Sequence, residues 1–528
     1  MSNHAYESAA ALRPSSNGPI PISTLCERFS LAPASAEDAA VLNDLSILGV
    51  SVDSADTAPG ELFVGLPGFT VHGARFAADA VASGAVAVLT DADGAQIVHQ
   101  TAPGTPVLVH SDPRAVVGPL SAEVYHHPAR GLVTTAVTGT NGKTTTAYFL
   151  DAILSAHVGG CMVAGTVELR VGERSVESPR TTVEAPVLQR MMALAVEDKV
   201  GAASLEASSH AIVLHRLDGI VVDVAGFTNL QRDHLDFHKT MEGYLEAKAQ
   251  LFTPEHARRG VVCVDDQWGA ALAAEAPIEI DRVRAYPGET PADWWVSDAA
   301  VSLTDSATTF TLHGPDGEKI EASCPLPGLV NVQNAALALV MAIRAGVPAA
   351  TAAAALAGAH NIPGRMQRIS QRDGRRGLCI VDFAHTPEAM ELALKAVRPI
   401  TPGRLIVVFG SDGDRDQGKR PMLGEVCARL ADVLVVTDEN PRSEDPQLIR
   451  NAILEGVRGV RPDLTDVEEI TTWRGDAVRR GVELCGPDDT VIVTGKGHEP
   501  FLEMAGEFIR YNDAPVMAEA VEEKWGRA

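Results

Sequence analysis

The sequence predicts an α/β protein of three domains, for three reasons. Its 528 residues exceed the usual size of one hydrophobic core and correspond to roughly three domains. Short apolar runs alternate with helix-length segments, which is typical of parallel sheets covered by helices. An apolar run at 132–137 leads into a glycine loop and a plausible helix, the order of a phosphate-binding strand, loop and helix. We therefore expect a small α/β domain, a central P-loop ATPase-type domain and a C-terminal Rossmann-like domain.

The first two domains follow from composition and pattern. Residues 1–20 are rich in Ser, Pro, Asn and Ala, and we predict that they are disordered. The first folded domain is predicted at 21–131, where helical stretches separate strand patterns at 61–65, 85–90 and 106–110. The central domain is predicted at 132–361 and ends at an Asn-Ile-Pro-Gly hinge, 361–364.

The third domain, 362–528, contains the clearest strand pattern. Three continuous apolar runs predict buried parallel strands at 404–409, 432–437 and 490–494. Each run leads into a polar loop containing Gly or Pro, at 410–420, 438–442 and 495–499. Open α/β sheets bind ligands at the carboxyl ends of their strands, so these loops predict a ligand site.

Composition narrows the classes of partner. A formal charge of -25 argues against a nucleic-acid partner, because a polyanion is repelled without a concentrated basic face. The seven cysteines are odd in number and have no C-x-x-C spacing, which favours reduced cytoplasmic thiols. No apolar run approaches the ~20 residues of a membrane span. We expect a cytoplasmic monomer that binds small molecules.

The glycine loop has the composition of a nucleotide-binding loop. Its backbone N–H groups would wrap phosphates, Lys143 would neutralise their outer charge, and the Thr144 hydroxyl would hold Mg²⁺. The alternative is a glycine turn before an ordinary helix. The predicted ATP-binding residues of this loop are Gly139, Thr140, Asn141, Gly142, Lys143, Thr144 and Thr145.

Two segments downstream carry candidate metal ligands. Glu206 follows a short apolar stretch and could complete the metal shell that Thr144 begins, or could cap a helix. Residues 233–238 contain two His and two Asp, which is dense for a solvated loop and indicates contact with metal or phosphate. His234 lies in this segment.

Together these motifs resemble the MurE class of the Mur ligase family, from about residue 50 to the C-terminus. The matching runs are T-G-T-N-G-K-T-T, E-x-S-S-H-A, T-N-L-x-R-D-H-L-D-F-H and 244–252. The resemblance implies ATP-dependent ligation in peptidoglycan precursor synthesis. ATP phosphorylates the D-Glu γ-carboxylate of UDP-N-acetylmuramoyl-L-alanyl-D-glutamate, and a diamino acid's amine attacks the acyl phosphate. The products are a UDP-muramoyl tripeptide, ADP and phosphate.

By the same resemblance, the catalytic residues are Lys143, His234 and Lys248. Thr144, Glu206, His234 and a carbamylated Lys248 would hold Mg²⁺. Carbamylation changes the charge of a lysine from positive to negative and supplies oxygen ligands, which hard cations prefer. Without the resemblance, Lys248 would be interpreted as an exposed helix lysine.

The resemblance also assigns substrate contacts. The first domain would bind the UDP-sugar, and the UDP-muramoyl dipeptide would contact Ser54, Thr181, Thr182, Ser208, His210 and Arg216. Ala55, Val183 and Leu214 depart from the family pattern at neighbouring positions. Further ATP contacts would come from Asn331, Asn334, Arg365, Asp382 and His385.

The three loops of the last domain would select the amino acid. The D-E-N-P-R segment, 438–442, is close to the D-N-P-R form associated with meso-diaminopimelate, although Glu439 replaces Asp. A second carboxylate on the substrate needs an Arg, and its ammonium needs a carboxylate. Alternatively, each Arg pairs with a surface Asp. The predicted amino-acid-binding residues are Arg415, Asp438, Asn440, Arg442, Gly495 and Glu499.

Other functions stay open beside this hypothesis. The same ligation could use L-lysine or L-ornithine. A sister ligase, either the alanyl-alanine-adding Mur enzyme or a folylpolyglutamate synthetase, would not typically combine D-E-N-P-R with G-K-G-H-E. A catalytically silent homologue would act as a binding partner and would not need Lys143, Glu206 and Lys248 together. A generic P-loop kinase or GTPase is disfavoured by the short loop.

Overall fold

The computed structural model describes residues 9–302, 307–359 and 362–526. The chain folds into two compact units. Unit 1 extends to Arg284 and includes 288–294 and 337–355; unit 2 comprises 285–287, 295–336 and the residues from Leu356 onward. The predicted hinge residue Asn361 lies outside the described residues, and the predicted domain boundaries remain predictions.

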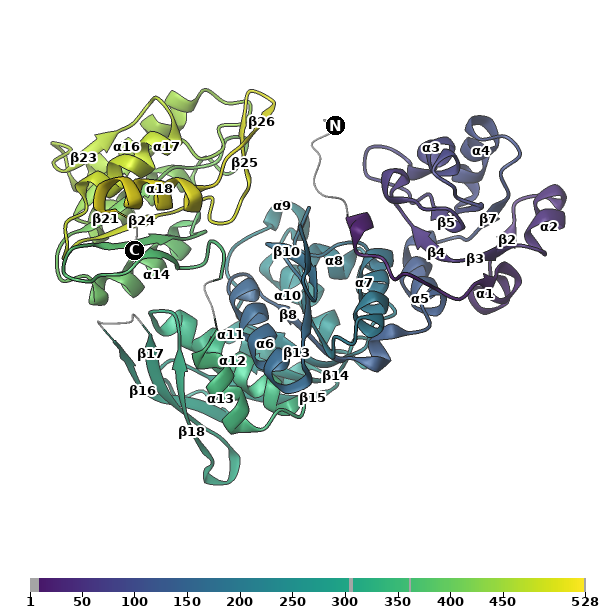
Figure 1. Cartoon of the computed structure of the whole chain (residues 1–528), viewed down its shortest axis with the longest axis horizontal. Coiled ribbons are helices and arrows are strands. Elements are labelled where there is room, and N and C mark those ends of the chain that lie inside the picture. Colours follow the sequence, from purple (N-terminus) through teal and green to yellow (C-terminus); the bar gives the residue numbers. More distant parts are fainter. Residues whose placement is uncertain (1–8, 303–306, 360–361, 527–528) are drawn as a thin grey trace. The chain divides into compact units, whose positions relative to one another are not determined.

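Unit 1 begins with a five-stranded sheet of order β2-β7-β6-β5-β4 (Figure 1). β4 to β7 are parallel, and β2 is antiparallel to β7. The strands are β2 (Ala32–Pro33), β4 (Gly49–Ser51), β5 (Glu61–Val64), β6 (Ala87–Thr90) and β7 (Val107–Val109). The last three confirm the strand patterns expected from the sequence. A two-stranded sheet pairs β1 (Ile20–Pro21) with β3 (Ser46–Ile47).

The helices of this part begin where the sequence offers capping side chains. Asp91 and Asp112 accept first-turn N–H groups of α4 and α5, respectively. The helices are α1 (Ile22–Phe29), α2 (Ala36–Leu42), α3 (Ala77–Ala82), α4 (Ala92–Thr101) and α5 (Pro113–Val124), with short 3₁₀ turns η2 (Ser54–Asp56), η3 (Gly73–Phe76) and η4 (Pro128–Gly131). Leu62, Val64 and Leu89 are fully buried beneath them.

The predicted disorder of residues 1–20 is wrong for residues 9–20. Residues 1–8 lie outside the described residues. After the turn η1 (Ala9–Ala11), the Leu12 side chain is fully buried and Arg13 pairs with Asp56 and Glu61. The Ser15 N–H donates to the Glu197 carboxylate at 2.9 Å. The polar, proline-bearing composition predicted disorder because it does not show that Leu12 is buried or that Arg13 has two carboxylate partners.

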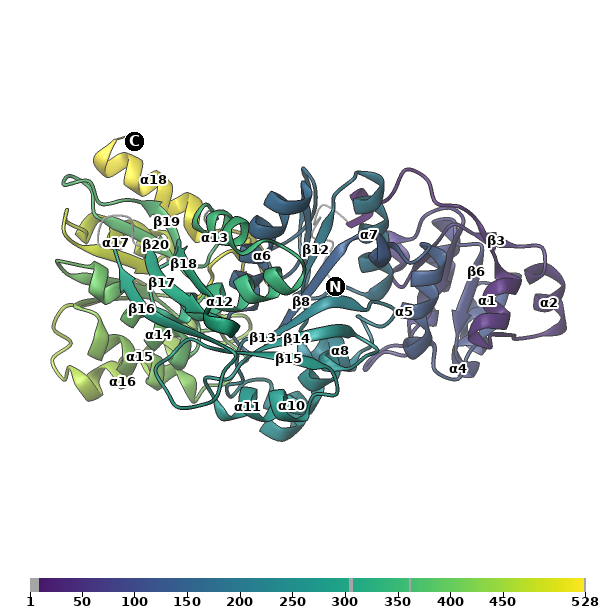
Figure 2. The ribbon, with the colours of Figure 1, turned by 90° about the horizontal axis from the view of Figure 1, so that it is seen from below.

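The unit 1 strands of the second sheet have the order β11-β10-β9-β12-β8-β13-β14-β15. The six strands from β9 to β15 in this order are parallel, and β10 and β11 add an antiparallel hairpin. Figure 2 shows β12, β8, β13, β14 and β15 side by side. The strands are β8 (Val133–Thr138), β9 (Cys161–Ala164), β10 (Glu168–Val171), β11 (Arg174–Glu177), β12 (Ala202–Glu206), β13 (Val222–Phe227), β14 (Ala257–Cys263) and β15 (Glu279–Arg284). The apolar run expected to be a strand is therefore the middle strand β8, beside β12 and β13.

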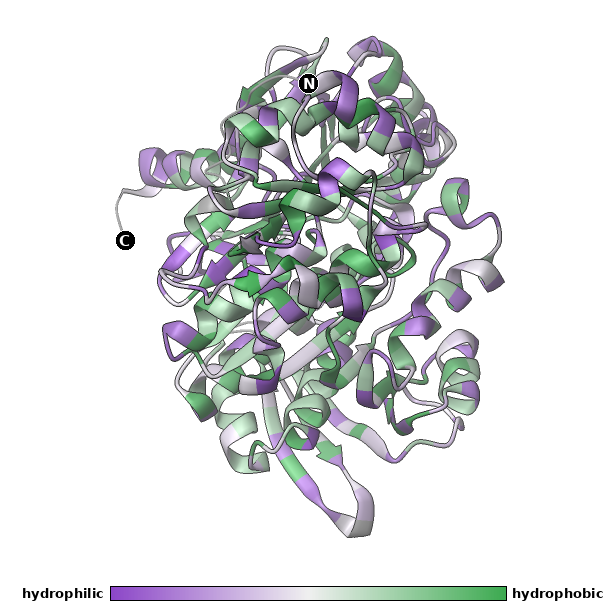
Figure 3. Ribbon diagram, turned by 90° about the vertical axis from the view of Figure 1, so that its right-hand side faces the viewer, coloured by the Kyte–Doolittle hydropathy of each residue, from purple (hydrophilic) through white to green (hydrophobic). Residues whose placement is uncertain are grey.

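Helices pack against this sheet. Thr240 and Asp266 cap α10 and α11. The elements are α6 (Lys143–Val158), α7 (Ala185–Glu197), α8 (Ser209–Val213), α9 (Leu235–His238), α10 (Met241–Ala249), η5 (Gln250–Phe252) and α11 (Gln267–Glu275). Green apolar and purple polar residues alternate along the helical ribbons in Figure 3, as expected for helices with one buried side.

Unit 2 contains antiparallel strands that the sequence did not predict. β16 (Trp294–Val301), β17 (Thr308–His313) and β18 (Lys319–Cys324) form hairpins in which exposed and buried residues partly alternate. The turn η6 (Pro315–Gly317) joins the last two. Helix α12 (Leu329–Arg344) follows and belongs to unit 1 from Leu337 onward, and helix α13 (Ala349–Ala357) belongs to unit 1 as far as Ala355.

The C-terminal sheet has the order β19-β20-β24-β21-β22-β23. All strands except β19 are parallel. The strands are β19 (Gln367–Ser370), β20 (Leu378–Val381), β21 (Leu405–Phe409), β22 (Val433–Val436), β23 (Val467–Glu469) and β24 (Thr490–Val493). The three runs predicted as parallel strands are the adjacent strands β24, β21 and β22, so their polar loops leave the same edge of the sheet.

The remaining elements of the chain enclose this sheet. The helices are α14 (Pro387–Val397), η7 (Arg398–Ile400), α15 (Lys419–Leu430), α16 (Pro446–Val460), α17 (Arg474–Leu484) and α18 (Asp513–Trp525). A hairpin of β25 (Phe501–Met504) and β26 (Glu507–Arg510) follows the last polar loop. An isolated bridge joins Arg442 to Met504, so the hairpin lies beside the loop after β22. The α/β class with parallel sheets is confirmed.

Two further findings concern the whole described chain. All seven cysteines lie in the described ranges, each is a free thiol, and six are buried. Within those ranges, no helix combines the length and hydrophobicity needed to cross a bilayer.

Candidate functional site

The glycine loop after β8 has a backbone that depends on its glycines. Gly139 has φ +145°, and an added Cβ atom there would lie 1.9 Å from the Thr228 Oγ1 atom. Gly142 has φ +91° and caps α6, which begins at Lys143. The N-terminus of α6, with the N–H groups of its first turn, therefore lies directly at the loop, as in anion sites at helix N-termini.

The segment after β13 holds this loop in place. Asn229 accepts the Thr140 N–H with its backbone oxygen at 2.9 Å and the Asn141 N–H with its side-chain oxygen at 3.0 Å. The Asn141 amide also donates to the Gln231 Oε1 atom at 2.8 Å. Thr145 is buried in the first turn of α6. The predicted phosphate loop thus lies on a rigid support.

Thr144 and Glu206 meet at the ends of β8 and β12. The Thr144 hydroxyl donates to the Glu206 Oε2 atom at 3.0 Å, and both side chains are buried. Thr166 gives the same carboxylate its backbone N–H at 2.8 Å and its hydroxyl at 2.9 Å. These donors are neutral, so a buried carboxylate and a hydroxyl form an oxygen pair suited to a hard divalent cation.

Two lysines converge on the phosphate loop. The Lys143 ammonium donates to the backbone oxygens of Gly139 at 3.0 Å and Thr140 at 2.8 Å. The Lys248 Nζ atom donates to the same Gly139 oxygen at 2.8 Å, and its side chain is only 1% exposed. Burial first, and then the Lys143 charge, hold the pKa of Lys248 well below its ordinary value. The interpretation of Lys248 as an exposed helix lysine is therefore wrong.

His234 lies close to this pair. It occupies the left-handed region at φ +53°, its Nε2 atom is 3.5 Å from the Asp233 carboxylate, and its ring centroid is 4.9 Å from that of His210. Burial lowers the pKa of His234, and the charges of Lys143 and Lys248 lower it further, against the opposing effect of Asp233. Within the described chain, no group of three His, Cys, Asp or Glu side chains forms a potential metal cage.

The predicted dipeptide contacts lie around the end of β12. The Thr182 hydroxyl donates to the Glu206 backbone oxygen at 2.6 Å and accepts the Ser208 N–H at 3.0 Å. Arg216 donates to the Thr182 backbone oxygen at 3.1 Å and pairs with Glu184 at 2.9 Å. These bonds fix the loop before α7 and the start of α8 relative to each other.

The other predicted contacts are more dispersed. The Thr181 Oγ1 atom lies 3.2 Å from the Thr166 Oγ1 atom, whose hydrogen goes to Glu206, so Thr181 lies near the Glu206 carboxylate. The half-buried His210 ring packs 4.3 Å from the Phe237 ring, and burial lowers its pKa. Ser54 lies in η2, in the first part of unit 1.

In unit 2, two predicted ATP contacts lie on α12. The Asn331 amide donates to the Pro327 backbone oxygen at 2.8 Å. Asn334 is 2% exposed, and its buried Oδ1 atom has no hydrogen-bond donor among the described residues. A buried amide oxygen without a donor is costly, and a ligand N–H group could satisfy it.

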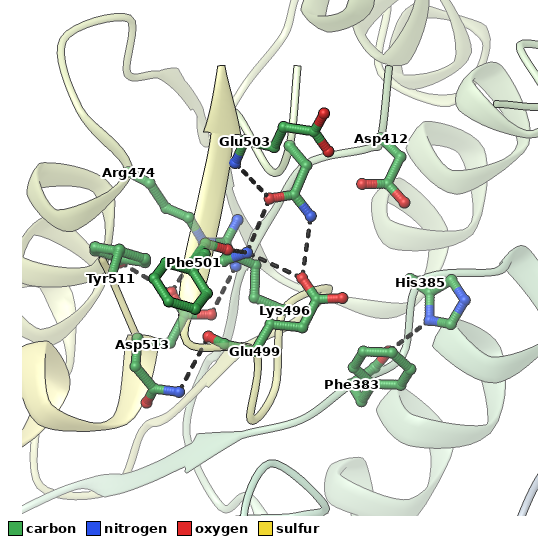
Figure 4. Close-up of polar contacts among 12 residues, drawn as sticks. Phe383, His385, Asp412, Arg474, Lys496, Glu499, Phe501, Glu503, Tyr511 and Asp513 are labelled. Carbon is green, nitrogen blue, oxygen red and sulfur yellow. Dashed lines mark hydrogen bonds and ion pairs between the residues drawn. The ribbon is translucent and has the colours of Figure 1, made fainter. Parts of the chain in front are cut away.

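The three other predicted ATP contacts lie near the end of β20, and Figure 4 shows one of them, His385, beside Phe383. The buried Asp382 carboxylate accepts the Met366 N–H at 2.8 Å and the Ala384 N–H at 2.9 Å, and burial raises its pKa. The Arg365 guanidinium lies 4.3 Å from the Phe383 ring centroid. The His385 ring is 4.6 Å from the same aromatic ring.

The loops after β22 and β24 share a polar network. The Asn440 amide donates to the Glu499 Oε2 atom at 3.0 Å. The fully buried Lys496 ammonium donates to the Asn440 Oδ1 atom at 2.9 Å and to the Glu499 Oε2 atom at 3.0 Å (Figure 4). At Gly495, an added Cβ atom would lie 2.4 Å from the Glu439 Oε2 atom. The structure thus brings together three of the predicted amino-acid-binding residues.

Arg442 and Arg415 have different surroundings. The Arg442 guanidinium pairs with Glu503 at 3.1 Å and lies 3.9 Å from the Asp412 carboxylate. Arg415 is exposed in the loop after β21. That loop is held by the buried Arg420, which pairs with Glu444 at 2.8 Å. Arg442 therefore belongs to the polar edge formed by the two other loops, while Arg415 faces solvent.

Asp438 lies outside the Asn440 network. Its carboxylate pairs with Arg450 of α16, and its backbone oxygen accepts a bond from Arg474 at 2.9 Å. Arg474 and Asp513 form a fully buried ion pair at 2.8 Å, and Arg474 also donates to the Thr494 backbone oxygen at 2.7 Å. Arg474 therefore fixes the ends of β22 and β24 relative to α18.

Comparison with known proteins places this geometry in a family. Three family models match: "Mur ligase family, catalytic domain" at 46–125, "Mur ligase middle domain" at 137–342 and "Mur ligase, glutamate ligase domain" at 364–497. A Streptomyces avermitilis protein named UDP-N-acetylmuramoyl-L-alanyl-D-glutamate--2,6-diaminopimelate ligase is 43% identical over 92% of this chain and 94% of its own. The chain belongs to the Mur ligase family.

Two further relatives extend this assignment. A Leifsonia xyli protein named UDP-N-acetylmuramyl-tripeptide synthetase is 42% identical over 95% of this chain and 96% of its own. A solved structure of a UDP-N-acetylmuramoyl-L-alanyl-D-glutamate--2,6-diaminopimelate ligase has 31% identity and a TM-score of 0.63, covering 92% of this chain and 96% of that one. The predicted three-domain architecture is confirmed, and this Mur ligase is an ATP-dependent ligase.

Sequence reasoning missed five residues that contact the predicted site residues, Thr166 in unit 1 and Phe383, Arg474, Lys496 and Glu503 in unit 2. Lys496 stands inside the G-K-G-H-E motif, so its position was visible although its role was not. Arg474 and Glu503 lie in no motif that the sequence analysis singled out. Their partners are 39 and 61 positions away, and only the fold brings them together.

Proposed function

We propose that this Mur ligase adds meso-diaminopimelate to UDP-N-acetylmuramoyl-L-alanyl-D-glutamate through an acyl phosphate. The observation that carries the proposal is the arrangement of Arg442, Asn440 and Glu499 at one edge of the C-terminal sheet. A guanidinium suits the distal carboxylate of the substrate, and a carboxylate suits its distal ammonium. The two relatives whose names include diaminopimelate support this choice of amino acid.

The reaction begins on the phosphate loop. The loop's N–H groups and Lys143 bind and orient the ATP phosphates, so that a D-Glu γ-carboxylate oxygen attacks the γ-phosphorus and ADP leaves. The substrate amine then attacks the acyl carbon, phosphate departs with the bond's electron pair, and the nitrogen loses a proton. The first step brings two anions together, and their repulsion opposes it. The positive charge of Lys143 offsets this repulsion.

Mg²⁺ fits the oxygen donors of unit 1. Thr144, Glu206, His234 and a carbamylated Lys248 would hold it. The ion would neutralise phosphate charge during phosphoryl transfer. A lysine with a depressed pKa is neutral more often than an exposed one, and only the neutral amine can attack CO₂, so burial of Lys248 supports carbamylation.

The remaining predicted contacts complete the proposal. Asn334 has an acceptor for a nucleotide N–H, and Arg365 and His385 flank Phe383 near Asp382. We assign ATP contacts to these residues and Asn331, and dipeptide contacts to Ser54, Thr181, Thr182, Ser208, His210 and Arg216. We also propose that the protein works in the cytoplasm as a monomer.

Purified protein should be incubated with ATP, Mg²⁺ and the UDP-muramoyl dipeptide, with meso-diaminopimelate, L-lysine or L-ornithine added separately. Product mass and phosphate release identify the amine used. We expect tripeptide only with diaminopimelate. Product with lysine or ornithine would support the ligase activity and refute diaminopimelate as the amino acid added. This alternative remains because the name of the Leifsonia xyli relative specifies no amino acid. If none of the three amino acids gives product, a catalytically silent homologue would be favoured.

A further inference from the structure

Lys496 is a buried cation inside the polar network after β24. Its side chain is fully buried, and its ammonium has three acceptors, which matches its three N–H groups. They are the Asn440 Oδ1 atom at 2.9 Å, the Glu499 Oε2 atom at 3.0 Å and the Phe501 backbone oxygen at 2.6 Å (Figure 4). The acceptors come from the loop after β22, the loop after β24 and the start of β25, beside the proposed amino-acid contacts.

This ammonium fixes the orientation of the Asn440 amide. The Asn440 Oδ1 atom accepts from Lys496 and from the Glu503 N–H at 3.2 Å, so both of its lone pairs are used. A flipped amide would direct its NH₂ group at the ammonium and lose both bonds. The Nδ2 atom must therefore face Glu499, which accepts one of its two hydrogens at 3.0 Å. The second hydrogen has no acceptor among the described residues.

The same ammonium determines which Glu499 oxygen is occupied. Lys496 and Asn440 both donate to Oε2, and no donor to Oε1 is found among the described residues. The Glu499 side chain is 36% exposed, whereas that of Lys496 is 0% exposed. The Glu499 Oε1 atom can thus accept a substrate ammonium, while Lys496 and Asn440 hold the Oε2 atom.

We infer that Lys496 is a positioning residue for the amino-acid substrate. It does not touch the substrate; it holds Asn440 and Glu499 so that one amide hydrogen and one carboxylate oxygen face the incoming diamino acid. This inference rests on the proposed function and deepens it. Removing the ammonium would leave buried polar groups unpaired and let both side chains turn, which weakens recognition of the amine substrate.

The test compares Lys496→Met with the wild-type protein in two assays. The first traps the acyl phosphate with hydroxylamine in the absence of any amino acid. The second measures KM for each substrate in complete turnover. We expect an unchanged hydroxamate yield and unchanged KM values for ATP and the UDP-muramoyl dipeptide, while KM for diaminopimelate rises about 10-fold or more. Lys496→Gln, which keeps an uncharged NH₂ donor, should give an intermediate KM and serves if the Met variant does not fold.

Lys524→Met is the matched control. The Lys524 ammonium also donates to three oxygens, those of Val482, Glu483 and Cys485, which are all backbone carbonyls at the end of α17. Its loss should lower Tm and leave KM for diaminopimelate unchanged.

Three results would overturn the inference. They are an unchanged KM for the amino acid in folded Lys496→Met, an equal rise for all three substrates, or a lost hydroxamate yield. A wild-type protein that yields neither hydroxamate nor tripeptide would instead refute the proposed function, and the inference with it.

Discussion

The predicted phosphate-binding residues of unit 1 (the phosphate side) and the predicted amino-acid-binding residues of unit 2 (the amino-acid side) are held in different ways. On the phosphate side, backbone geometry does most of the work: Gly139 and Gly142 shape the loop, and Asn229 holds it through backbone and side-chain bonds. On the amino-acid side, side-chain ion pairs dominate, including Lys496–Glu499 and Arg442–Glu503.

This difference determines how each side responds to change. A backbone loop presents N–H groups that any anion of the right shape can use, so its chemistry depends on a few glycines and one lysine. A side-chain network can alter its preference when one charge is replaced, because each partner orients the next. We therefore expect substitutions to abolish chemistry on the phosphate side and to redirect binding on the amino-acid side.

The largest effect is expected for Lys143→Met. The phosphate loop would keep its shape but lose the charge that neutralises the ATP phosphates, and kcat/KM should fall by about 10³-fold. Unlike Lys496→Met, this variant should also lose the hydroxylamine-trapped acyl phosphate. The exposed Lys199→Met serves as control and should retain full activity. Normal hydroxamate formation by Lys143→Met would contradict the division between the two sides.

Arg474→Met tests the support of the amino-acid side. The substitution removes the cationic partner of the fully buried Asp513 carboxylate and should destabilise the C-terminal domain by about 3–5 kcal/mol. Arg479 lies on the same helix α17, but its pairs with Glu519 and Glu523 are exposed, so Arg479→Met should cost at most about 1 kcal/mol. Hydrogen exchange of β22 and β24 measures both. Equal protection in the two variants would show that the buried pair does not hold these strand ends.

Arg442→Ala should change the choice of amino acid. Loss of charge-assisted bonds to the distal carboxylate should raise KM for diaminopimelate by about 10- to 100-fold and leave any turnover with lysine unaffected. Glu503→Gln is the complementary variant, because it releases Arg442 from its carboxylate partner and should not raise KM for diaminopimelate. An equal loss with both amino acids in Arg442→Ala would refute the proposed carboxylate contact.

The sequence predicted the phosphate side better than the amino-acid side, because backbone patterns lie in consecutive residues whereas side-chain pairs join residues that are distant in the chain. The glycine loop was predicted because strand, glycines and helix are consecutive, and its Thr144 does meet Glu206. The strand ends β21, β22 and β24 were also predicted, since continuous apolar runs indicate buried parallel strands. The pairing of Asp438 with Arg450 was not predictable, because a motif does not say which way a side chain turns. Burial of Lys248 was likewise invisible in the helix pattern alone.

The last prediction concerns the pH dependence of stability through two carboxyl groups of unit 2, Glu439 and Glu444. Burial, together with the Asp412 charge, raises the pKa of Glu439 to about 8 from an ordinary value of 4.5. Between these values the folded chain binds a proton that the unfolded chain has released, so the stability of wild-type protein should fall as pH rises through this window. Glu439→Gln cannot ionise and should lose this component of the decline.

Glu444 should show the opposite sign, which makes the pair diagnostic. Its hydrogen bonds with Arg420 lower its pKa, so its contribution is present above the ordinary carboxyl pKa and is lost as pH falls toward the depressed value. Free energies of unfolding at pH 3, 5, 7 and 9 for wild type, Glu439→Gln and Glu444→Gln measure both slopes. The difference in unfolding free energy between Glu439→Gln and wild type should grow from pH 5 to pH 9. The difference between Glu444→Gln and wild type should be fully present at pH 5 and above, and should shrink toward pH 3. If the difference in unfolding free energy between Glu439→Gln and wild type does not vary from pH 5 to 9, the Glu439 carboxyl is ionised in the folded chain throughout this range. The amino-acid side then carries one more negative charge than a raised pKa of Glu439 predicts.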